Sequence, residues 1–133
     1  MGTGPNFVID KGLLVQGSAA VVFGTLYQGG TVDQSATPHT AATAQRSIGV
    51  AQESIDAAKV ATGKVFANFR LLGISRVRAG AAIATRYQRV GPDASGRAIV
   101  STAGNIAAGI NLTTAGAAEE HVDVLLTPGA IAT

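Results

Sequence analysis

The segment GPDASG, residues 91–96, combines one proline, one aspartate and two glycines within six residues. Glycine-dense loops of this kind can cradle a phosphate group, because their backbone N–H groups converge on an anion. They can also simply reverse the chain, since proline is preset for a bend and glycine can adopt a positive φ. The first interpretation predicts a nucleotide-binding enzyme, and the second predicts a hairpin turn.

Residue types that serve catalysis or metal binding are few. The chain has no cysteine, which excludes disulfides, thiolate metal sites and cysteine nucleophiles. His39 and His121 have no neighbours at metal-ligand spacing, and both are predicted to be ordinary loop or surface residues. The phosphate-binding pattern fails in AAKVATGK, residues 57–64, because Ala58 replaces the first glycine and the residue after Lys64 has no hydroxyl. We therefore expect no enzymatic activity, no cofactor and no bound metal.

The strongest charge feature is the basic segment 64–97, whose seven cations and one acid give it a net charge of +6. Phe66 shares a predicted strand face with Lys64 and Arg70, as in a platform that stacks single-stranded nucleic acid. Cations of this segment could instead form solvated strand faces or meet an acidic protein partner. We expect the protein partner. Four arginines are predicted to form one patch if their strands pair: Arg76, Arg78, Arg86 and Arg89.

Alternation of apolar and polar side chains predicts an all-β protein, a small barrel or sandwich of short strands. In KVFANFRLL, residues 64–72, side chains at every second position from Val65 share one face. The final segment HVDVLL, residues 121–126, sets Val122 and Val124 against polar neighbours in the same way. Further strands are predicted at residues 6–9, 19–27, 47–52, 74–80, 97–100 and 106–112, and short helices at 56–61 and 115–120.

The chain is predicted to form one domain over residues 13–133, preceded by a flexible N-terminal arm of residues 1–12. Within the domain, the polar and proline-containing residues 33–45 are predicted to form a long loop. A weak internal repeat is also present, since TAQRSIGVAQESIDAA (43–58) resembles TAGNIAAGINLTTAGAA (102–118). The spacing of about 60 residues predicts two related units in a pseudo-symmetric barrel.

The surface of this chain must be poor in charge, because 14% of its residues are charged while 47% are hydrophobic. This composition predicts burial against other chains, and we expect a homo-oligomer, with a trimer favoured and a dimer as the alternative. Residues 12–32 carry no charge, but glycines, glutamines and hydroxyl side chains interrupt them. We therefore expect neither a membrane-spanning helix nor a signal peptide there.

The C-terminal half contains a series of motifs rich in small residues. They occupy residues 81–83, 93–98, 103–104, 109–112, 115–118 and 122–126. In this order they resemble the phage capsid decoration, or cement, family, and IGVAQ (48–52) fits the first such unit of that family. The resemblance covers most of residues 46–129. The chain departs from the family pattern at Thr85-Arg86, where a glycine is usual.

The resemblance implies a structural virion protein, made in the cytoplasm of a bacterial host. Such a protein coats the outer surface of the capsid, binds the major capsid protein and cements neighbouring subunits. We expect an added strand to pair with a neighbouring chain, formed by Pro5, Asn6, Phe7, Val8 and Ile9. The family places no chemistry in residues 91–96, so the hairpin turn is favoured there. Two alternatives stay open: a single-stranded nucleic-acid-binding barrel, and a small tail or baseplate subunit.

Overall fold

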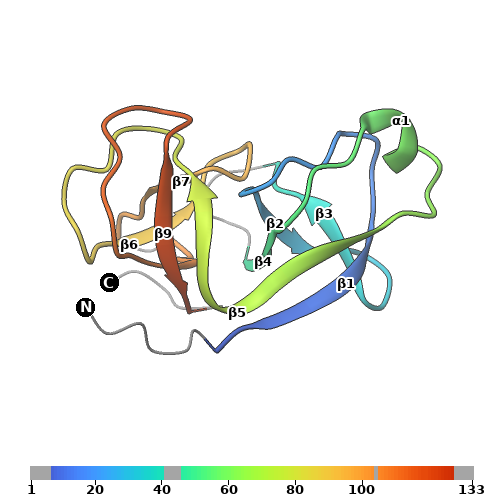
Figure 1. Ribbon diagram of the computed structural model, residues 1–133, viewed down its shortest axis with the longest axis horizontal. Helices are drawn as coiled ribbons and strands as arrows, with labels where there is room; N and C mark the ends of the chain where they lie inside the picture. The colour runs from blue at the N-terminus through green and yellow to red at the C-terminus, as the bar shows by residue number, and fades with distance from the viewer. Residues whose placement is uncertain (1–6, 41–45, 104, 128–133) are drawn as a thin grey trace.

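The computed structural model describes residues 7–40, 46–103 and 105–127. It is nearly all-β, with 48% of residues in strands and 3% in helix, which confirms the predicted fold class. The elements are β1 (Ile9–Val15), β2 (Leu26–Gly29), β3 (Ser35–Pro38), β4 (Ser47–Ala51), α1 (Ala57–Val60), β5 (Phe66–Arg78), β6 (Arg89–Pro92), β7 (Ala98–Val100), β8 (Gly109–Asn111) and β9 (His121–Leu126). Two groups of strands lie side by side, with β5 running through both (Figure 1).

The first five strands close into a barrel in the order β1-β3-β2-β4-β5. Neighbouring strands are antiparallel, except that β1 and β3 pair in parallel, with Val15 beside Ala36. The ring closes because β1 also pairs with β5, where Leu13 lies opposite Ala67. The predicted alternation in β5 is present, since Ala67 and Phe69 are buried while their neighbours Phe66 and Asn68 are exposed.

Strand β5 has 13 residues and bends along its length (Figure 1). Residues up to Leu72 pair with β1, and residues from Gly73 onward pair with β9. Gly73 has a φ of +102°, a conformation that side chains with a Cβ rarely adopt. A Cβ there would also lie 2.6 Å from the carbonyl oxygen of Phe7. Glycine is therefore required both by the bend and by the N-terminal segment that crosses it.

The second half of β5 begins a second unit with the same topology. Across the sheet it is followed by β9, β8, β6 and β7. A parallel bridge from Ala98 in β7 to Ala79 then returns to the end of β5. The resulting order β5-β7-β6-β8-β9 repeats β1-β3-β2-β4-β5 strand for strand. The structure thus confirms the two related units that the internal repeat predicted, and it shows that they share one strand.

Bridges outside the named strands repeat as well. They join Val21 to Ile55 in the first unit and Ile83 to Ala115 in the second. In both units the bridge connects the loop after the first strand to the loop before the last one. Ile55 and Ala115 are about 60 residues apart, which is the spacing of the two sequence motifs.

The glycines shared by the two sequence motifs lie at equivalent places, Gly49 in β4 and Gly109 in β8. A Cβ on Gly49 would lie 2.8 Å from the carbonyl oxygen of Arg70, in the last strand of the first unit. A Cβ on Gly109 would meet the carbonyl oxygen of Leu125, in the last strand of the second unit. The close approach of two strands therefore explains why both motifs contain a glycine here.

Each unit has its own hydrophobic core. In the first unit Tyr27 and Phe69 are buried and pack edge to face, with ring centroids 5.1 Å apart. The core of the second unit is aliphatic and is centred on residues such as Val77 and Val122. Leu26 and Val50 come from strands of the first unit but pack into the core of the second. The two units are consequently in direct apolar contact.

Several predicted boundaries near the N-terminus are wrong. The segment 19–27 is not one strand, because Gly24 has a φ of +80° and breaks the extended chain before β2. The predicted strand at 6–9 begins instead at Ile9, as β1. Residues 9–12 therefore belong to β1 and pair with β5, rather than to an N-terminal arm of residues 1–12. Residues 1–6 lie outside the described residues.

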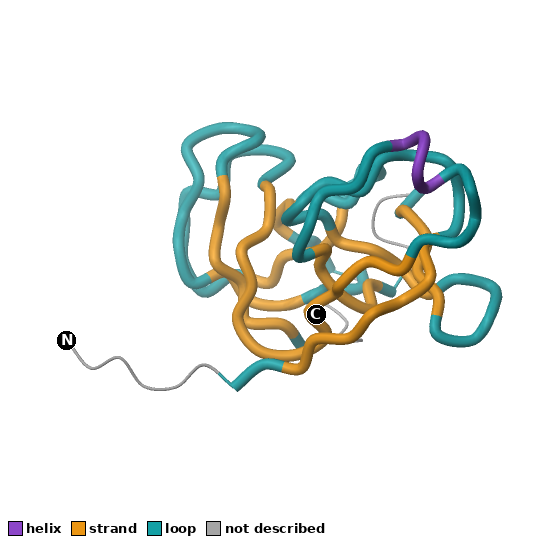
Figure 2. Tube along the Cα trace, turned by 45° about the vertical axis from the view of Figure 1, so that its right-hand side comes forward, coloured by secondary structure: helices purple, strands orange, loops and turns teal. Residues whose placement is uncertain are grey.

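The predicted long loop at 33–45 is also wrong in part. Residues Ser35–Pro38 form β3, although their composition is polar and ends in proline. Ser35 is buried, and its hydroxyl donates to the carbonyl oxygen of Val32 at 2.6 Å, so its polar group is satisfied within the fold. The short helix α1 falls inside the predicted helix at 56–61 (Figure 2), whereas the predicted helix at 115–120 is wrong, because Ala115 forms a bridge and residues 116–119 form bends and turns.

Candidate partner-binding surface

Exposed apolar side chains gather around the bend of β5. This cluster, called the bend patch below, consists of Phe7, Val8, Ile9, Leu72 and Leu125, which are 37% to 83% exposed. Strand pairing places Ile9 opposite Leu72, and Leu125 opposite Ile74 just beyond the bend. Phe7 and Val8 lie against Gly73 at the bend itself. Contiguous exposed apolar surface of this kind is typical of contact with another chain.

Three of the residues predicted to contact a partner lie in the bend patch. Phe7 is 83% exposed, and Val8 and Ile9 are also exposed. Ile9 is already paired with Leu72 of its own chain, because β1 begins there. The other two residues of the predicted added strand, Pro5 and Asn6, lie outside the described residues.

An arginine fixes the strands on both sides of the bend. Nε and Nη2 of Arg70 donate to the two carboxylate oxygens of Asp10 at 2.8 and 3.1 Å. Nη1 of Arg70 donates to the carbonyl oxygen of Ile74 at 3.0 Å. Two-pronged ion pairs of this kind are stronger and more directional than single contacts. The hydrogen bonds from Arg70 lower the pKa of Asp10 below its ordinary value, although partial burial opposes them.

The Asp10→Asn substitution is expected to lower the free energy of unfolding at neutral pH by about 1 kcal/mol or less, because the pair is near the surface. Since the pKa of Asp10 is lower in the folded state, its stabilising effect is present above its unfolded value of about 4. The effect is lost as the pH falls through the lowered folded-state pKa. Urea unfolding at pH 7 and pH 2.5 measures this. A difference between wild type and variant that persists at pH 2.5 would contradict it.

The four arginines predicted to form one patch lie on strands that do not pair. Arg76 and Arg78 are in β5, whereas Arg89 begins β6 and Arg86 precedes it. Strands β9 and β8 lie between β5 and β6 on one side of the second unit, and β7 lies between them on the other. The condition on which a single patch was predicted is therefore not met. Arg76, Arg86 and Arg89 are exposed, and Arg78 is half-buried.

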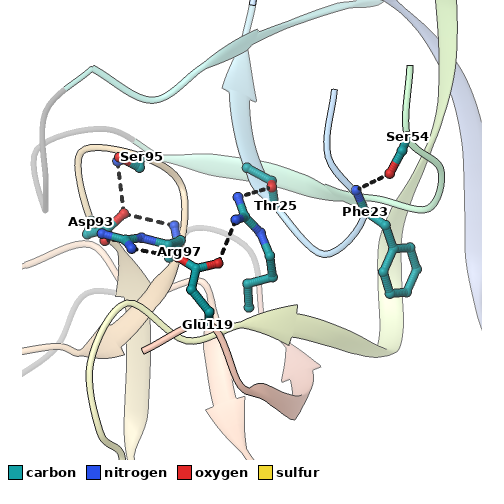
Figure 3. A network of polar contacts seen from close by, with 8 residues as sticks. Phe23, Thr25, Ser54, Asp93, Ser95, Arg97 and Glu119 are labelled. Atoms are coloured by element: carbon teal, nitrogen blue, oxygen red, sulfur yellow. Dashed lines mark hydrogen bonds and ion pairs between the residues drawn. The ribbon is translucent and has the colours of Figure 1, made fainter. Parts of the chain in front are cut away.

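Arg78 takes part in an ion-pair network that joins the two units. Its Nη1 donates to Glu119 at 2.9 Å and its Nη2 to the hydroxyl of Thr25 at 2.8 Å. Glu119 also accepts from Arg97 at 2.7 Å, and Arg97 pairs with Asp93 at 2.9 Å. Figure 3 shows Glu119 between Arg97 and the segment that carries Thr25. The hydrogen bond from Arg97 is the main cause that lowers the pKa of Glu119.

The glycine-rich segment is a turn within this network. The carboxylate of Asp93 accepts from the backbone N–H groups of Ser95 and Arg97 at 2.8 and 2.9 Å (Figure 3). Gly96 has a φ of +77°, and its carbonyl oxygen accepts from Leu26 N–H at 2.8 Å. The N–H groups of residues 95 and 97 thus face a carboxylate of the same chain. The hairpin-turn interpretation is confirmed, with Pro92 as the last residue of β6 rather than within the bend.

The aromatic platform considered for nucleic acid is incomplete. Phe66 is 63% exposed, as a stacking surface requires. However, the guanidinium of Arg70 on the same strand is paired with Asp10. Arg78 and Arg97 of the basic segment are likewise paired with carboxylates. Much of the positive charge counted in the sequence is therefore neutralised within the fold.

The two histidines have different environments. His39 lies in the loop after β3, as predicted, but it is buried (3% exposed) rather than on the surface, and its Nε2 lies 2.9 Å from the hydroxyl of Ser47. His121 is exposed at the start of β9, beside Phe23. Within residues 7–40, 46–103 and 105–127, no three metal-ligating side chains come together. No helix in the same ranges is long and apolar enough to cross a membrane.

Sequence reasoning missed the two leucines of the bend patch. Leu72 follows Leu71, and Leu125 precedes Leu126, within strands that alternate. Adjacent residues of a strand face opposite sides, so one leucine of each pair had to point outward. The doublets were thus a signal for exposed apolar surface on β5 and β9.

Comparisons with known proteins include a structural match that covers nearly the whole chain. No protein-family model matches the chain, and no curated protein sequence matches it. The crystal structure of the head fiber gp8.5 N base in bacteriophage phi29 is similar, with a TM-score of 0.63 and 14% sequence identity. The match covers 96% of this chain and 100% of the other. The two chains therefore share a fold.

Proposed function

We propose that this chain is a structural protein of a phage virion that coats the outer surface of the capsid and cements neighbouring major capsid subunits. The match to a phage head fiber base carries this proposal, because it extends over nearly the full length of both chains. The sequence resemblance to the capsid decoration family supports the same kind of particle. Three of the motifs that carry this resemblance, residues 48–52, 109–112 and 122–126, overlap β4, β8 and β9.

The bend patch is the proposed contact with the capsid. Its apolar side chains belong to three segments that the fold brings together, residues 7–9, the middle of β5 and the end of β9. Burying them against a major capsid subunit would remove apolar surface from water. Sister copies are the second proposed partner, as a homotrimer or a dimer, because the chain has few charged residues for its apolar content.

The double substitution Leu72→Ser with Leu125→Ser is expected to weaken capsid binding by about tenfold or more, which corresponds to about 1.4 kcal/mol. The thermal midpoint should change little, because these side chains are 46% and 40% exposed. Co-sedimentation of the purified protein with expanded capsids that lack it measures the binding.

A matched control is the double substitution Val22→Ser with Val32→Ser. These valines are 40% and 50% exposed, and they lie in the loops before and after β2. The control should bind capsids as the wild type does. Equal loss in both double variants would contradict a role for the bend patch. A wild-type protein that does not sediment with capsids would contradict the proposed function itself.

A further inference from the structure

Tyr87 has an unusual backbone conformation for an exposed aromatic residue. Its φ is +63°, and its side chain is 71% exposed. The repeat gives a direct comparison, because Gly24 occupies the equivalent place in the first unit, with a φ of +80°. The N–H of Gly24 donates to Ala51 at 2.9 Å, and the N–H of Tyr87 donates to Asn111 at 2.8 Å. The backbone is thus the same in both units, and it favours glycine.

The loop that carries Tyr87 is held rigidly from beneath. Asn111 is fully buried, and its side-chain amide donates to the carbonyl oxygens of Thr85 and Thr113 at 2.8 Å each. Its side-chain oxygen accepts from the N–H of Gln88 at 2.8 Å. Bonds on both sides of Tyr87 therefore hold the backbone that carries its ring. A preorganised loop loses less conformational entropy when a partner binds it.

The equivalent corner of the first unit is in contact with the second unit. The carbonyl oxygen of Gly24 accepts from the backbone N–H of Arg78 at 2.9 Å, and the hydroxyl of Thr25 accepts from Nη2 of the Arg78 side chain. Leu26 N–H donates to Gly96 in the second unit. One β unit thus packs on this corner through a cation and backbone hydrogen bonds. The corresponding corner of the second unit is exposed at residues 84–87.

The charge around Tyr87 indicates the kind of partner. Arg86 precedes it directly and is exposed, and residues 81–92 contain no acidic side chain. An exposed aromatic beside an arginine is suited to a protein surface with an apolar recess and an acidic rim. Single-stranded nucleic acid would need a longer track of cations, and Arg78 and Arg97 nearby in sequence are paired with carboxylates.

We propose that Tyr87 is the anchor of a second partner-binding surface, which takes an acidic face of a protein. This inference rests on the proposed function, in which that protein is a major capsid subunit. The surface is distinct from the bend patch, because it lies in the loop between β5 and β6. Two separate contacts on one chain would allow it to bridge two neighbouring subunits.

The Tyr87→Gly substitution separates binding from folding. It removes the aromatic ring and also relieves the backbone, so the thermal midpoint should stay the same or rise. Binding to expanded capsids should fall by about tenfold or more. Tyr87→Phe retains the ring and should bind within a fewfold of wild type. Arg86→Glu should weaken binding more at low salt than at high salt, because exposed charges are screened by ions.

Three outcomes of these binding measurements would overturn the inference, and they can be told apart. Undiminished capsid binding by Tyr87→Gly, with binding lost in the bend-patch double variant, would overturn this inference and leave the proposed function intact. Absence of binding by the wild type would overturn both. Tight binding of the wild type to a single-stranded oligonucleotide, lost in Tyr87→Gly, would overturn the protein partner in favour of nucleic acid.

Discussion

The Gly109→Ala substitution is expected to lower the free energy of unfolding by about 1–3 kcal/mol, the usual effect of overpacking a core position. The added Cβ would meet the carbonyl oxygen of Leu125 and would lie 2.7 Å from the side chain of Val124. Both residues belong to β9, which pairs with β8. The two strands must therefore move apart, and their ladder of hydrogen bonds is weakened.

Urea unfolding monitored by circular dichroism measures this change. Two other glycine variants serve as the positive and the negative control. Gly49→Ala, at the equivalent place of the first unit, should cause a similar loss. Gly12→Ala in β1 should be neutral or slightly stabilising, because nothing lies within 4 Å of the added Cβ and alanine reduces the entropy of the unfolded chain. Equal losses at Gly12 and Gly109 would show that the close approach of strands is not the cause.

The Asn111→Ala substitution is expected to lower the free energy of unfolding by about 3 kcal/mol, since each of the hydrogen bonds lost contributes about 1 kcal/mol. Asn111 is 0% exposed, and its side chain makes three hydrogen bonds to backbone groups. Alanine would leave those groups, in Thr85, Gln88 and Thr113, without their partner.

Asn68→Ala is the matched control, because Asn68 is also in a strand but is exposed to solvent. Its unfolding free energy should stay within about 0.5 kcal/mol of wild type. Hydrogen exchange measures the local effect. The N–H of Gln88 should exchange faster in Asn111→Ala than in the wild type when the two proteins are compared at the same fraction of unfolded molecules. A loss of stability no larger than that of Asn68→Ala would contradict a stabilising role for the hydrogen bonds of the Asn111 side chain.

Much of the second unit could be predicted from sequence. Val122 and Val124 alternate with polar residues, and the structure buries both in β9. The glycine shared by the two motifs revealed the repeat, because a close approach of strands demands the same small residue in both units. Local pattern was sufficient where a strand has one buried and one exposed face.

The remaining elements depend on distant partners that no local pattern reveals. Ser35–Pro38 has the composition of a loop, but it is a strand because β1 and β2 lie on either side of it. The prediction of one arginine patch required β5 and β6 to be neighbours, and other strands separate them on both sides. Tyr87 gave no signal at all, since its conformation is understood only by comparison with Gly24 in the other unit.

Because the two units share strand β5, the first barrel can form before the second unit while the chain is being synthesised. All strand pairings of the first barrel involve residues up to Leu72, whereas the second unit cannot pair β9 until residues 121–126 have been made. As the chain leaves the ribosome, the first barrel has every hydrogen-bonding strand it needs while about half of the polypeptide is still to come. The free end of β5 then offers a preformed edge on which the nascent second unit is templated.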